Sequence, residues 1–301
     1  MLNVCIPVYN YDIRPLVRSL HDQAALLDVP AEILVVDDAS ALPFQEMNRE
    51  VSTLPFVRYE ELTSNAGRSR IRNVLCHKAA YSFLIFMDCD SAPPDDQYLQ
   101  RYLDVADEEA VVCGGRSYLP LPPGDDTHLH WWYGSHREVR PASMRNNHPY
   151  QSFMTNNFMV PQSIMERIPF NESINGYGHE DTLFGYELKQ QKIPVRHIDN
   201  PLLHIGLQSE QEFLGKTREG ISNLWKIYCL LGKPSGFARM VRVLATFNRL
   251  DRLGLSGLFC LLSAPYQQRM LQNLKSNKPR LAYLDLYKLR LLCMEASKQN
   301  P

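Results

Sequence analysis

The sequence predicts an α/β protein with a mostly parallel central sheet, helices on both faces of that sheet and a helical C-terminal extension. Short apolar segments alternate with helical patterns through the first third of the 301 residues, which is typical of parallel strands joined by helices. Polar residues follow three of these segments, and the chain after residue 208 is helical in pattern. We therefore expect an α/β region over residues 1–206, with halves at 1–115 and 116–206, and an extension over 207–301.

Local patterns predict each element of the first half. Four short apolar segments indicate strands, at Leu2–Ile6, Glu32–Val36, Phe56–Tyr59 and Phe83–Met87. Helical patterns follow the first and third of them, at Asp12–Leu27, where Asp12 would be the N-cap, and at Gly67–Ala80. A further helix is expected near Asp95–Ala106, and a further strand at Ala110–Cys113.

The second half begins where this alternation stops. Residues Leu121–Tyr150 form a long connection rich in aromatic residues and histidines, and connections of this length are usually functional or disordered. Beyond it we expect a strand at Phe153–Val160 and a glycine-rich loop that becomes a helix over Gly176–Gln190. Short strands at Val195–Ile198 and Leu202–Ile205 would form a hairpin.

Composition limits the functional classes. The chain is 45% hydrophobic and 22% charged, as in an ordinary globular protein. Its seven cysteines include no CxxC pair, which argues against a disulfide framework or a zinc knuckle and favours a reducing compartment. The start does not resemble a signal peptide, and the apolar stretch at Leu253–Pro265 is too short to cross a bilayer. We therefore expect a cytoplasmic protein.

Charge is unevenly distributed along the chain. From Leu207 onward there are 15 Lys and Arg against 6 Asp and Glu, whereas residues 1–206 carry 17 against 27. Four arginines of the extension lie among apolar residues at roughly helical spacing, namely Arg239, Arg242, Arg249 and Arg252. A basic amphipathic helix suits the anionic inner face of a membrane. We favour a different interpretation, in which these helices pack on the α/β region and their arginines are solvated, because such charges are common on surface helices. No nucleic-acid partner is expected.

Polar residues at the ends of three predicted strands indicate one binding site. They are Pro7, Tyr9 and Asn10, then Asp37 and Asp38, then Asp88 and Asp90. Parallel strands bring their carboxyl ends to one edge of the sheet, where such folds bind ligands. The last pair alone could be two solvated turn residues. Side chains two positions apart share a face, however, and paired carboxylates suit Mg²⁺ or Mn²⁺ shared with substrate phosphates.

Five segments, in order, resemble the motifs of family 2 glycosyltransferases, which have the GT-A fold. They are VCIPVYN (4–10), ILVVDDAS (33–40), NAGRSRIRN (65–73), FMDCDS (86–91) and GYGHEDTLFGYEL (176–188). The third departs from the family pattern at Ile71, where alanine is usual, and the fifth has His179 before its acidic pair. Together the motifs cover roughly the first two thirds of the chain.

The resemblance implies a nucleotide pocket. Pro7, Tyr9 and Asn10 would line the pocket for the base and the ribose, with Tyr9 stacking on or capping the base. Asp38 would accept a hydrogen bond from the base, most naturally from a uracil imide N–H, and Asp37 is the alternative. Ordinary packing for Tyr9 and turn capping for the two aspartates are the competing interpretations.

The resemblance also implies a place for the diphosphate and a cation. Arg72, and with it Arg68, would lie near the nucleotide or its phosphates, although both could belong to a solvated helix face. Asp88 would approach the ribose or the metal, and Asp90 would bind Mn²⁺ or Mg²⁺. His204 would be a further metal ligand, against the commoner state of a hydrogen-bonded structural histidine.

For catalysis, the resemblance implies that Asp181, or less favourably Glu180, takes the proton from the acceptor hydroxyl. The competing interpretation is a helix N-terminal carboxylate favoured by the dipole. Trp131 and Trp132 would form a stacking platform for an acceptor sugar, or a hydrophobic cluster that pins a long loop. His179 would contact the acceptor or support the acidic pair.

These roles predict a metal-dependent inverting glycosyltransferase that transfers a sugar, a hexosyl or N-acetylhexosaminyl group, from a nucleotide diphosphate donor. A UDP-sugar is the expected donor and a saccharide or lipid-linked saccharide the expected acceptor, as in bacterial polysaccharide assembly. A sugar-nucleotide nucleotidyltransferase is an alternative, although no glycine-rich phosphate loop follows the first strand. A non-catalytic sugar-binding or assembly subunit is another.

Overall fold

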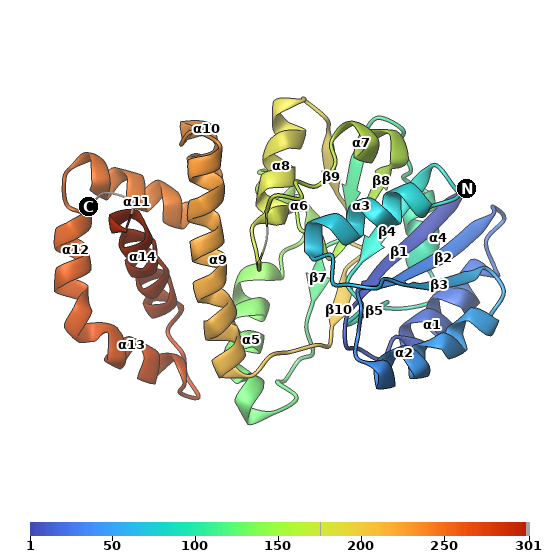
Figure 1. The fold of residues 1–301 in the computed structure, drawn as a ribbon, viewed down its shortest axis with the longest axis horizontal. Coiled ribbons are helices and arrows are strands. Elements are labelled where there is room, and N and C mark those ends of the chain that lie inside the picture. Colours follow the sequence, from blue (N-terminus) through green and yellow to red (C-terminus); the bar gives the residue numbers. More distant parts are fainter. Residues whose placement is uncertain (175, 299–301) are drawn as a thin grey trace.

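A seven-stranded sheet forms the centre of the computed structural model, which describes residues 1–174 and 176–298 (Figure 1). Its strand order is β3-β2-β1-β4-β8-β6-β9. The strands are β1 (Leu2–Val8), β2 (Ala31–Asp37), β3 (Val57–Glu61), β4 (Phe83–Met87), β6 (Val111–Cys113), β8 (Asn157–Pro161) and β9 (Val195–His197). Strands β1 to β4 are mutually parallel where they pair, and β8 runs antiparallel to both β4 and β6. The predicted mostly parallel α/β fold is thus confirmed.

Helices cover both faces of this sheet. The inward residues of β1 alternate between two cores, because successive side chains of a strand point to opposite faces. One core joins Val4 and Ile6 to α1 and α4, and the other joins Cys5 to α3, α7 and α8. The helices are α1 (Arg14–Ala24), α2 (Leu42–Asn48), α3 (Arg68–Lys78), α4 (Tyr98–Leu103), α7 (Gln162–Arg167) and α8 (Glu180–Gln190), and the 3₁₀ turn η1 spans Arg49–Thr53.

A second, three-stranded sheet lies at the carboxyl edge of the first. It consists of β5 (Ser91–Ala92), β10 (Leu202–His204) and β7 (Arg116–Ser117), in that order. The predicted hairpin of β9 and β10 is wrong. β9 pairs with β6 in the large sheet, whereas β10 pairs with β5 and β7, so non-local hydrogen bonding replaces the local pairing that we expected.

The connection at 121–150 is mostly helical. It contains η2 (Asp125–Thr127), α5 (His128–Tyr133), the π-helical turn η3 (Gly134–Glu138) and α6 (Ala142–Arg145). Leu129 is fully buried against Phe213 and Leu214, so tertiary packing orders this segment. The N-cap of α1 is Ile13 and not Asp12, but Asp12 Oδ1 still accepts a hydrogen bond from the Arg14 N–H at 3.1 Å.

The C-terminal part is helical, as predicted. Its helices are α9 (Glu210–Leu230), α10 (Ser235–Met240), α11 (Arg242–Arg252), α12 (Ser256–Ser263), α13 (Gln267–Leu274) and α14 (Leu281–Ser297), with the 3₁₀ turn η4 at Ala264–Tyr266. Ser209 and Glu212 form a capping box that starts α9. α9 stands between the other C-terminal helices and the α/β part (Figure 1) and packs on both α5 and α8.

None of the described helices combines the length and the hydropathy that a bilayer crossing requires.

Candidate active site

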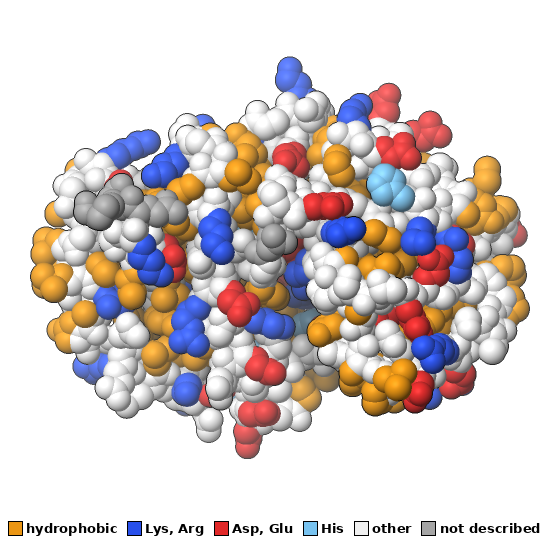
Figure 2. Space-filling model, in the orientation of Figure 1, with side chains coloured by type: hydrophobic (Ala, Val, Ile, Leu, Met, Phe, Trp, Pro, Cys, Tyr) orange, Lys and Arg blue, Asp and Glu red, His pale blue; other side chains and the backbone are white. Residues whose placement is uncertain are grey.

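The residues predicted at the strand ends converge on one cavity of about 330 Å³. Its walls come from the ends of β1, β2 and β4, the start of α3, and α9. It includes seven of the predicted site residues, namely Pro7, Tyr9, Asp38, Arg68, Arg72, Asp88 and Asp90. Figure 2 shows a recess between the α/β part and α9, with basic side chains at its edges. The carboxyl edge of the sheet therefore gathers these groups, as parallel topology requires.

Two neighbouring aspartates at the end of β2 have different surroundings. Asp37 is fully buried, and its carboxylate accepts hydrogen bonds from the Ser40 N–H at 2.6 Å and from the Tyr59 hydroxyl at 2.9 Å. Asp38 faces the cavity, and its two oxygens accept from the backbone N–H groups of Ala66 and Gly67 at 2.5 and 3.1 Å. The structure thus gives Asp37 an internal role and leaves only Asp38 at the cavity wall.

Asn10 joins two strand ends and lies outside the lining of the cavity. Its side-chain Oδ1 accepts from the Ala41 N–H at 2.8 Å, and its backbone N–H donates to Ser40 Oγ at 2.8 Å. The residue adopts a left-handed φ of 50°, a conformation that asparagine tolerates better than most side chains. Asn10 therefore fixes the loop that carries Tyr9, a residue that is 54% exposed.

Asp88 is held between two arginines. Arg72 Nη2 donates to its Oδ1 at 3.0 Å, and Arg116 Nη2 lies 3.5 Å from its Oδ2. Arg116 Nη1 also lies 3.0 Å from an oxygen of Glu138 in η3. Burial lowers the pKa of Arg72, but a guanidinium stays charged over the physiological range. Asp88 therefore orients two guanidinium groups, and that of Arg72 lines the cavity.

Asp90 and His204 form a second corner of the site. His204 Nδ1 lies 3.5 Å from Asp90 Oδ1, and both atoms are buried without a hydrogen-bond partner, as is Ser91 Oγ beside them. Burial alone would raise the pKa of Asp90, but His204, Arg116 and Arg68 hold it below its usual range. Unpaired buried polar atoms are costly, so the geometry is suited to a bound cation.

The chain supplies few ligands for such a cation. Among the described residues, no group of three or more His, Cys, Asp or Glu side chains is placed to hold a metal. One carboxylate oxygen and one imidazole nitrogen leave most coordination positions to donor phosphates and water, which is the usual arrangement for Mg²⁺ and close relatives. Asp90 and His204 therefore fit a cation that arrives with its substrate.

Backbone pairing sets the distance between these two ligands. His204 lies opposite Ser91 in the antiparallel pair of β10 and β5. The Asp90 carbonyl then accepts hydrogen bonds from the backbone N–H groups of Ile205 and Gly206 at 2.9 and 3.3 Å. A Cβ at Gly206 would collide with the Asp90 carboxylate, so this close approach requires glycine.

The acidic pair begins helix α8. Arg68 Nε donates to Glu180 Oε1 at 2.5 Å. Burial alone would raise the pKa of Glu180, but Arg68 and Arg72 lower it to about 2. Burial, with repulsion from the Glu180 carboxylate, raises the pKa of Asp181 to about 6. The two neighbouring carboxylates therefore differ widely in basicity, a division typical of acid–base sites.

Asp181 keeps one oxygen available. Its Oδ1 accepts from the Thr182 N–H at 2.6 Å and from the Thr182 hydroxyl at 3.2 Å. No hydrogen bond to any described residue engages its Oδ2. His179, at the N-cap position with a left-handed φ of 68°, lies with Nδ1 3.1 Å from the Thr182 hydroxyl, and burial lowers its pKa to about 4. A neutral His179 thus supports the turn that presents Asp181.

Helix α9 contributes groups that sequence reasoning did not find. Asn223 Nδ2 donates to the Gly178 carbonyl at 2.6 Å and so anchors the loop before α8. The ring of Tyr177 lies near two cations, with Arg68 at 5.3 Å and Lys216 at 5.0 Å from its centroid. Lys216 also lines the cavity. Burial and then Arg68 lower the pKa of Lys216. No motif marks Lys216 or Asn223, because both belong to an ordinary amphipathic helix, whereas Tyr177 lies within the motif segment 176–188.

Two of the three predicted acceptor residues, Trp131 and Trp132, belong to an aromatic cluster on α5 and η3, whereas His179 lies at the start of α8. Trp132 stacks on His136 with ring centroids 4.2 Å apart, and His128 packs 5.8 Å from Trp131 and 5.7 Å from Trp132. The Trp131 indole N–H donates to the Leu119 carbonyl at 2.8 Å. Both indoles are partly exposed and neither lines the cavity at the strand ends. They stabilise the 121–150 segment locally and present aromatic surface to solvent.

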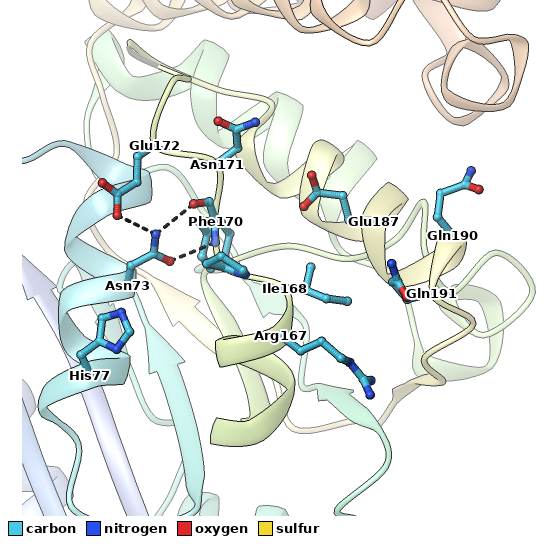
Figure 3. A pocket seen from close by; sticks show the side chains of 11 residues that line it. Asn73, His77, Arg167, Ile168, Phe170, Asn171, Glu172, Glu187, Gln190 and Gln191 are labelled. Atoms are coloured by element: carbon cyan, nitrogen blue, oxygen red, sulfur yellow. Dashed lines mark hydrogen bonds between the residues drawn. The ribbon is translucent and has the colours of Figure 1, made fainter.

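A larger cavity of about 650 Å³ lies elsewhere, between α3, α7, the segment at 168–172 and α8 (Figure 3). Figure 3 shows Asn73 bound to the Phe170 backbone and to Glu172, with Glu187 on the facing helix. Burial raises the pKa of Glu187 to about 7. None of the predicted site residues lines this cavity, so its size does not identify the reaction centre.

Comparison with known proteins agrees with this geometry. A family model described as Glycosyl transferase family 2 matches residues 3–170, which is more than half of the chain. The chain belongs to glycosyl transferase family 2. The matched segment contains every cavity residue named above except Lys216.

Relatives of this family 2 chain include polysaccharide synthases. It is 22% identical over 258 residues to chondroitin synthase of Escherichia coli, a match covering 72% of this chain and 36% of that protein. It is 24% identical over 255 residues to hyaluronan synthase of Pasteurella multocida, covering 72% and 25%. The chain thus spans between a quarter and about a third of the length of these relatives.

Solved structures of low identity share the fold. The mannosyltransferase PcManGT from Pyrobaculum calidifontis, in complex with GDP-Man and Mn²⁺, has a TM-score of 0.56 at 14% identity, with 99% of this chain and 86% of that chain covered. S. aureus TarS 1–349 in complex with UDP has a TM-score of 0.52 at 16% identity, covering 100% and 92%. The GT-A fold predicted for this family 2 chain is confirmed.

Proposed function

We propose that the chain is a metal-dependent inverting glycosyltransferase that moves a sugar from a UDP-sugar to a saccharide or lipid-linked saccharide acceptor. The main support for this proposal is the position of a candidate cation site next to basic side chains. The unpartnered buried atoms of Asp90 and His204 lie beside a cavity that Asp90 shares with Arg68 and Arg72. A cation site that adjoins guanidinium groups suits a diphosphate, whose charge both would neutralise.

The donor nucleotide would occupy the strand-end cavity. The Asp38 carboxylate accepts two backbone hydrogen bonds, and carboxylate oxygens have further lone pairs for a base N–H. The exposed ring of Tyr9 is free to stack on that base, and Pro7 lies beside it. A uracil imide N–H and the guanine edge both suit a carboxylate. Two neighbours of this fold carry UDP and GDP-Man, so the test below includes both nucleotides.

The diphosphate would lie toward Arg68, Lys216 and Asp90. A divalent cation held by Asp90 and His204 would neutralise the negative charge that develops on the diphosphate. Arg68 and Lys216 line the same cavity from α3 and α9, and each can donate to a phosphate oxygen. Asp88 holds Arg72 and Arg116 in place and also lines the cavity, where the ribose would approach it.

Asp181 would act as the general base. Its pKa of about 6 leaves it ionised at neutral pH yet basic enough to accept a proton, whereas Glu180 is paired with Arg68 and is a much weaker base. The acceptor hydroxyl gives its proton to Asp181 while its oxygen forms a bond to the anomeric carbon. The bond from that carbon to the diphosphate oxygen breaks, and the configuration inverts.

The acceptor is proposed to be a growing glycan. The chondroitin and hyaluronan synthases among the relatives carry names that fit polysaccharide assembly. The partly exposed Trp131 and Trp132 offer aromatic faces of the kind that pack on sugar rings, and His179 lies next to the proposed base. A cytoplasmic location is part of this proposal and is supported by the sequence, whose seven widely spaced cysteines include no CxxC pair.

Nucleotide release from a panel of UDP- and GDP-sugars tests the proposal. We expect one UDP-sugar to yield UDP in the presence of Mn²⁺ and an acceptor glycan, and no release with a chelator. A nucleotidyltransferase would instead release pyrophosphate from UTP and a sugar 1-phosphate. A non-catalytic subunit would bind UDP-sugar without turnover, so either result would contradict the proposal.

A further inference from the structure

Helix α12 (Ser256–Ser263) is an apolar helix without a buried residue. Its sequence is SGLFCLLS. Leu258, Leu261 and Leu262 are 50%, 70% and 61% exposed, and Leu253 before the helix is 70% exposed. Contiguous exposed apolar surface of this kind is rare on globular proteins and marks interaction sites. In Figure 1 the helix lies at the end of the molecule farthest from the large sheet.

The exposed leucines share one side of the helix. Leu255, Leu258 and Leu262 are spaced by three and four residues, and Leu261 lies beside them, so their side chains form one stripe. Phe259 and Cys260 occupy the opposite side and pack into the core shared with α9 and α14. The helix is therefore already fixed to the protein by its inner face. We call the exposed apolar side the α12 surface: Leu253, Leu255, Leu258, Leu261, Leu262 and Tyr266.

The chain around this surface is strongly basic. Residues 242–280 contain seven Lys and Arg and one acidic residue, Asp251, which accepts a hydrogen bond from the Ser256 hydroxyl. All seven cations are exposed: Arg242, Arg249, Arg252, Arg269, Lys275, Lys278 and Arg280. No ion pair joins any of them to a described carboxylate. The positive charge is thus unneutralised by the protein itself.

We propose that the α12 surface docks on an anionic lipid bilayer. Leucines that face one way, in a stretch of chain whose arginines and lysines are all exposed, match the boundary of a bilayer, where apolar side chains enter the acyl region and cations meet headgroup phosphates. A symmetric contact between two copies would instead bring two clusters of seven unpaired cations together, which disfavours association. The charge around the leucines therefore selects lipid over a second copy.

This inference changes the favoured interpretation of the basic C-terminal region. Sequence reasoning assigned membrane contact to arginines at helical spacing and preferred simple packing. The structure uses α11 for packing, with Leu244 and Phe247 buried, and exposes α12 instead. The docking face is distant from the strand-end cavity in the fold (Figure 1) and does not depend on the proposed reaction.

Flotation of the whole chain with lipid vesicles tests the proposal. One set contains phosphatidylcholine and phosphatidylglycerol, and the other phosphatidylcholine alone. We expect binding to the anionic vesicles only, with a loss at high salt because exposed charges are screened. The double variant L261Q/L262Q and the variant R249Q/R252Q should each lower the bound fraction by roughly tenfold. Leu26, which is 76% exposed just after α1 in the α/β part, provides the matched control L26Q, and it should bind as the parent does.

Two results would overturn the inference. One is equal flotation of the parent and L261Q/L262Q, and the other is no association of the parent with anionic vesicles. Sedimentation equilibrium tests whether the α12 surface binds a second copy of the chain instead. If the parent is a dimer and L261Q/L262Q is a monomer, the surface is a dimer contact, and lipid docking is contradicted. The substituted side chains are exposed, so folding should be retained, and circular dichroism verifies it.

Discussion

Arg68 and Glu180 form a 2.5 Å ion pair between the first residue of α3 and the first residue of α8. This contact links the arginine that lines the donor cavity to the turn that carries Asp181. It keeps Glu180 ionised, and the charge of Glu180 in turn contributes to the raised pKa of Asp181. Glu180 thus acts through its neighbours, as a positioning residue, and Asp181 is the group suited to proton transfer.

The substitution Asp181→Asn should abolish transfer while donor binding persists. The amide preserves shape but cannot accept the acceptor proton, and loss of a general base costs about 100-fold to 10,000-fold in rate. Turnover measured as UDP release, together with UDP affinity by calorimetry, separates the two effects. Asp181 lies outside the lining of the nucleotide cavity, so its UDP affinity should match that of the parent. Turnover near the parent rate would remove Asp181 from the mechanism.

Activity should fall at low pH as Asp181 becomes protonated. A base must be ionised to act, and the pKa of Asp181 is raised to about 6, so kcat/KM should increase with pH through a midpoint near 6 and level off above it. A pH profile at saturating metal measures this. An acid limb near pH 4, the range of an ordinary carboxyl group, would contradict the proposed environment of Asp181.

The variant Glu180→Gln should shift that profile. Removing the negative charge beside Asp181, and releasing Arg68 from its partner, both favour the ionised form of Asp181, so the acid limb should move to lower pH. The maximal rate should also fall, because Arg68 loses the contact that fixes it. A purely structural role of Glu180 would reduce the rate without moving the limb. Glu172→Gln offers a control, since Glu172 is half exposed and lies away from this turn.

The sequence predicted the parts of the fold that depend on local patterns. Strands β1, β2 and β4 are continuous apolar runs because both of their faces are buried, and their ends were predicted to within two residues. The hairpin prediction for β9 and β10 was wrong, because β10 finds its partners in β5 and β7, far away in the chain. The helix α5 was missed because packing of Leu129 on α9, and not local propensity, orders it.

The site, like the fold, was predictable where it depends on local pattern and topology, and not where it depends on contacts between remote segments. Asp38, Asp88 and Asp90 follow strands, so topology alone brings them to one edge. Their different partners could not be foreseen. Arg116 reaches Asp88 from a short strand without any motif, and Lys216 reaches the cavity from a helix assigned to a separate region. Side-chain contacts between remote elements depend on how those elements pack, and no local motif in a single sequence indicates such contacts.

Removing either proposed metal ligand should weaken cation binding. Asp90→Asn removes the carboxylate charge and His204→Gln removes the imidazole nitrogen, and these two groups face each other without hydrogen bonds, so Mn²⁺ affinity in the presence of UDP should fall by about 10-fold to 100-fold. Electron paramagnetic resonance of free Mn²⁺ measures this without catalysis. Thermal unfolding supplies the control, because it verifies that each variant stays folded. Unchanged Mn²⁺ affinity in both variants would place the cation elsewhere.

Lys216 should contribute to binding of the donor diphosphate, although it belongs to the C-terminal helices. It lines the cavity beside Arg68 and Asp90, and its ammonium group lies over Tyr177 with no carboxylate ion pair among the described residues. Lys216→Met keeps the apolar stem and removes a charge-assisted hydrogen bond, so affinity for UDP should fall by about tenfold or more, while affinity for uridine should not change. Lys226→Met, an exposed lysine on the same helix, is the matched control. Equal losses for UDP and uridine would mean that Lys216 only supports the fold, since a phosphate contact can distinguish the two ligands.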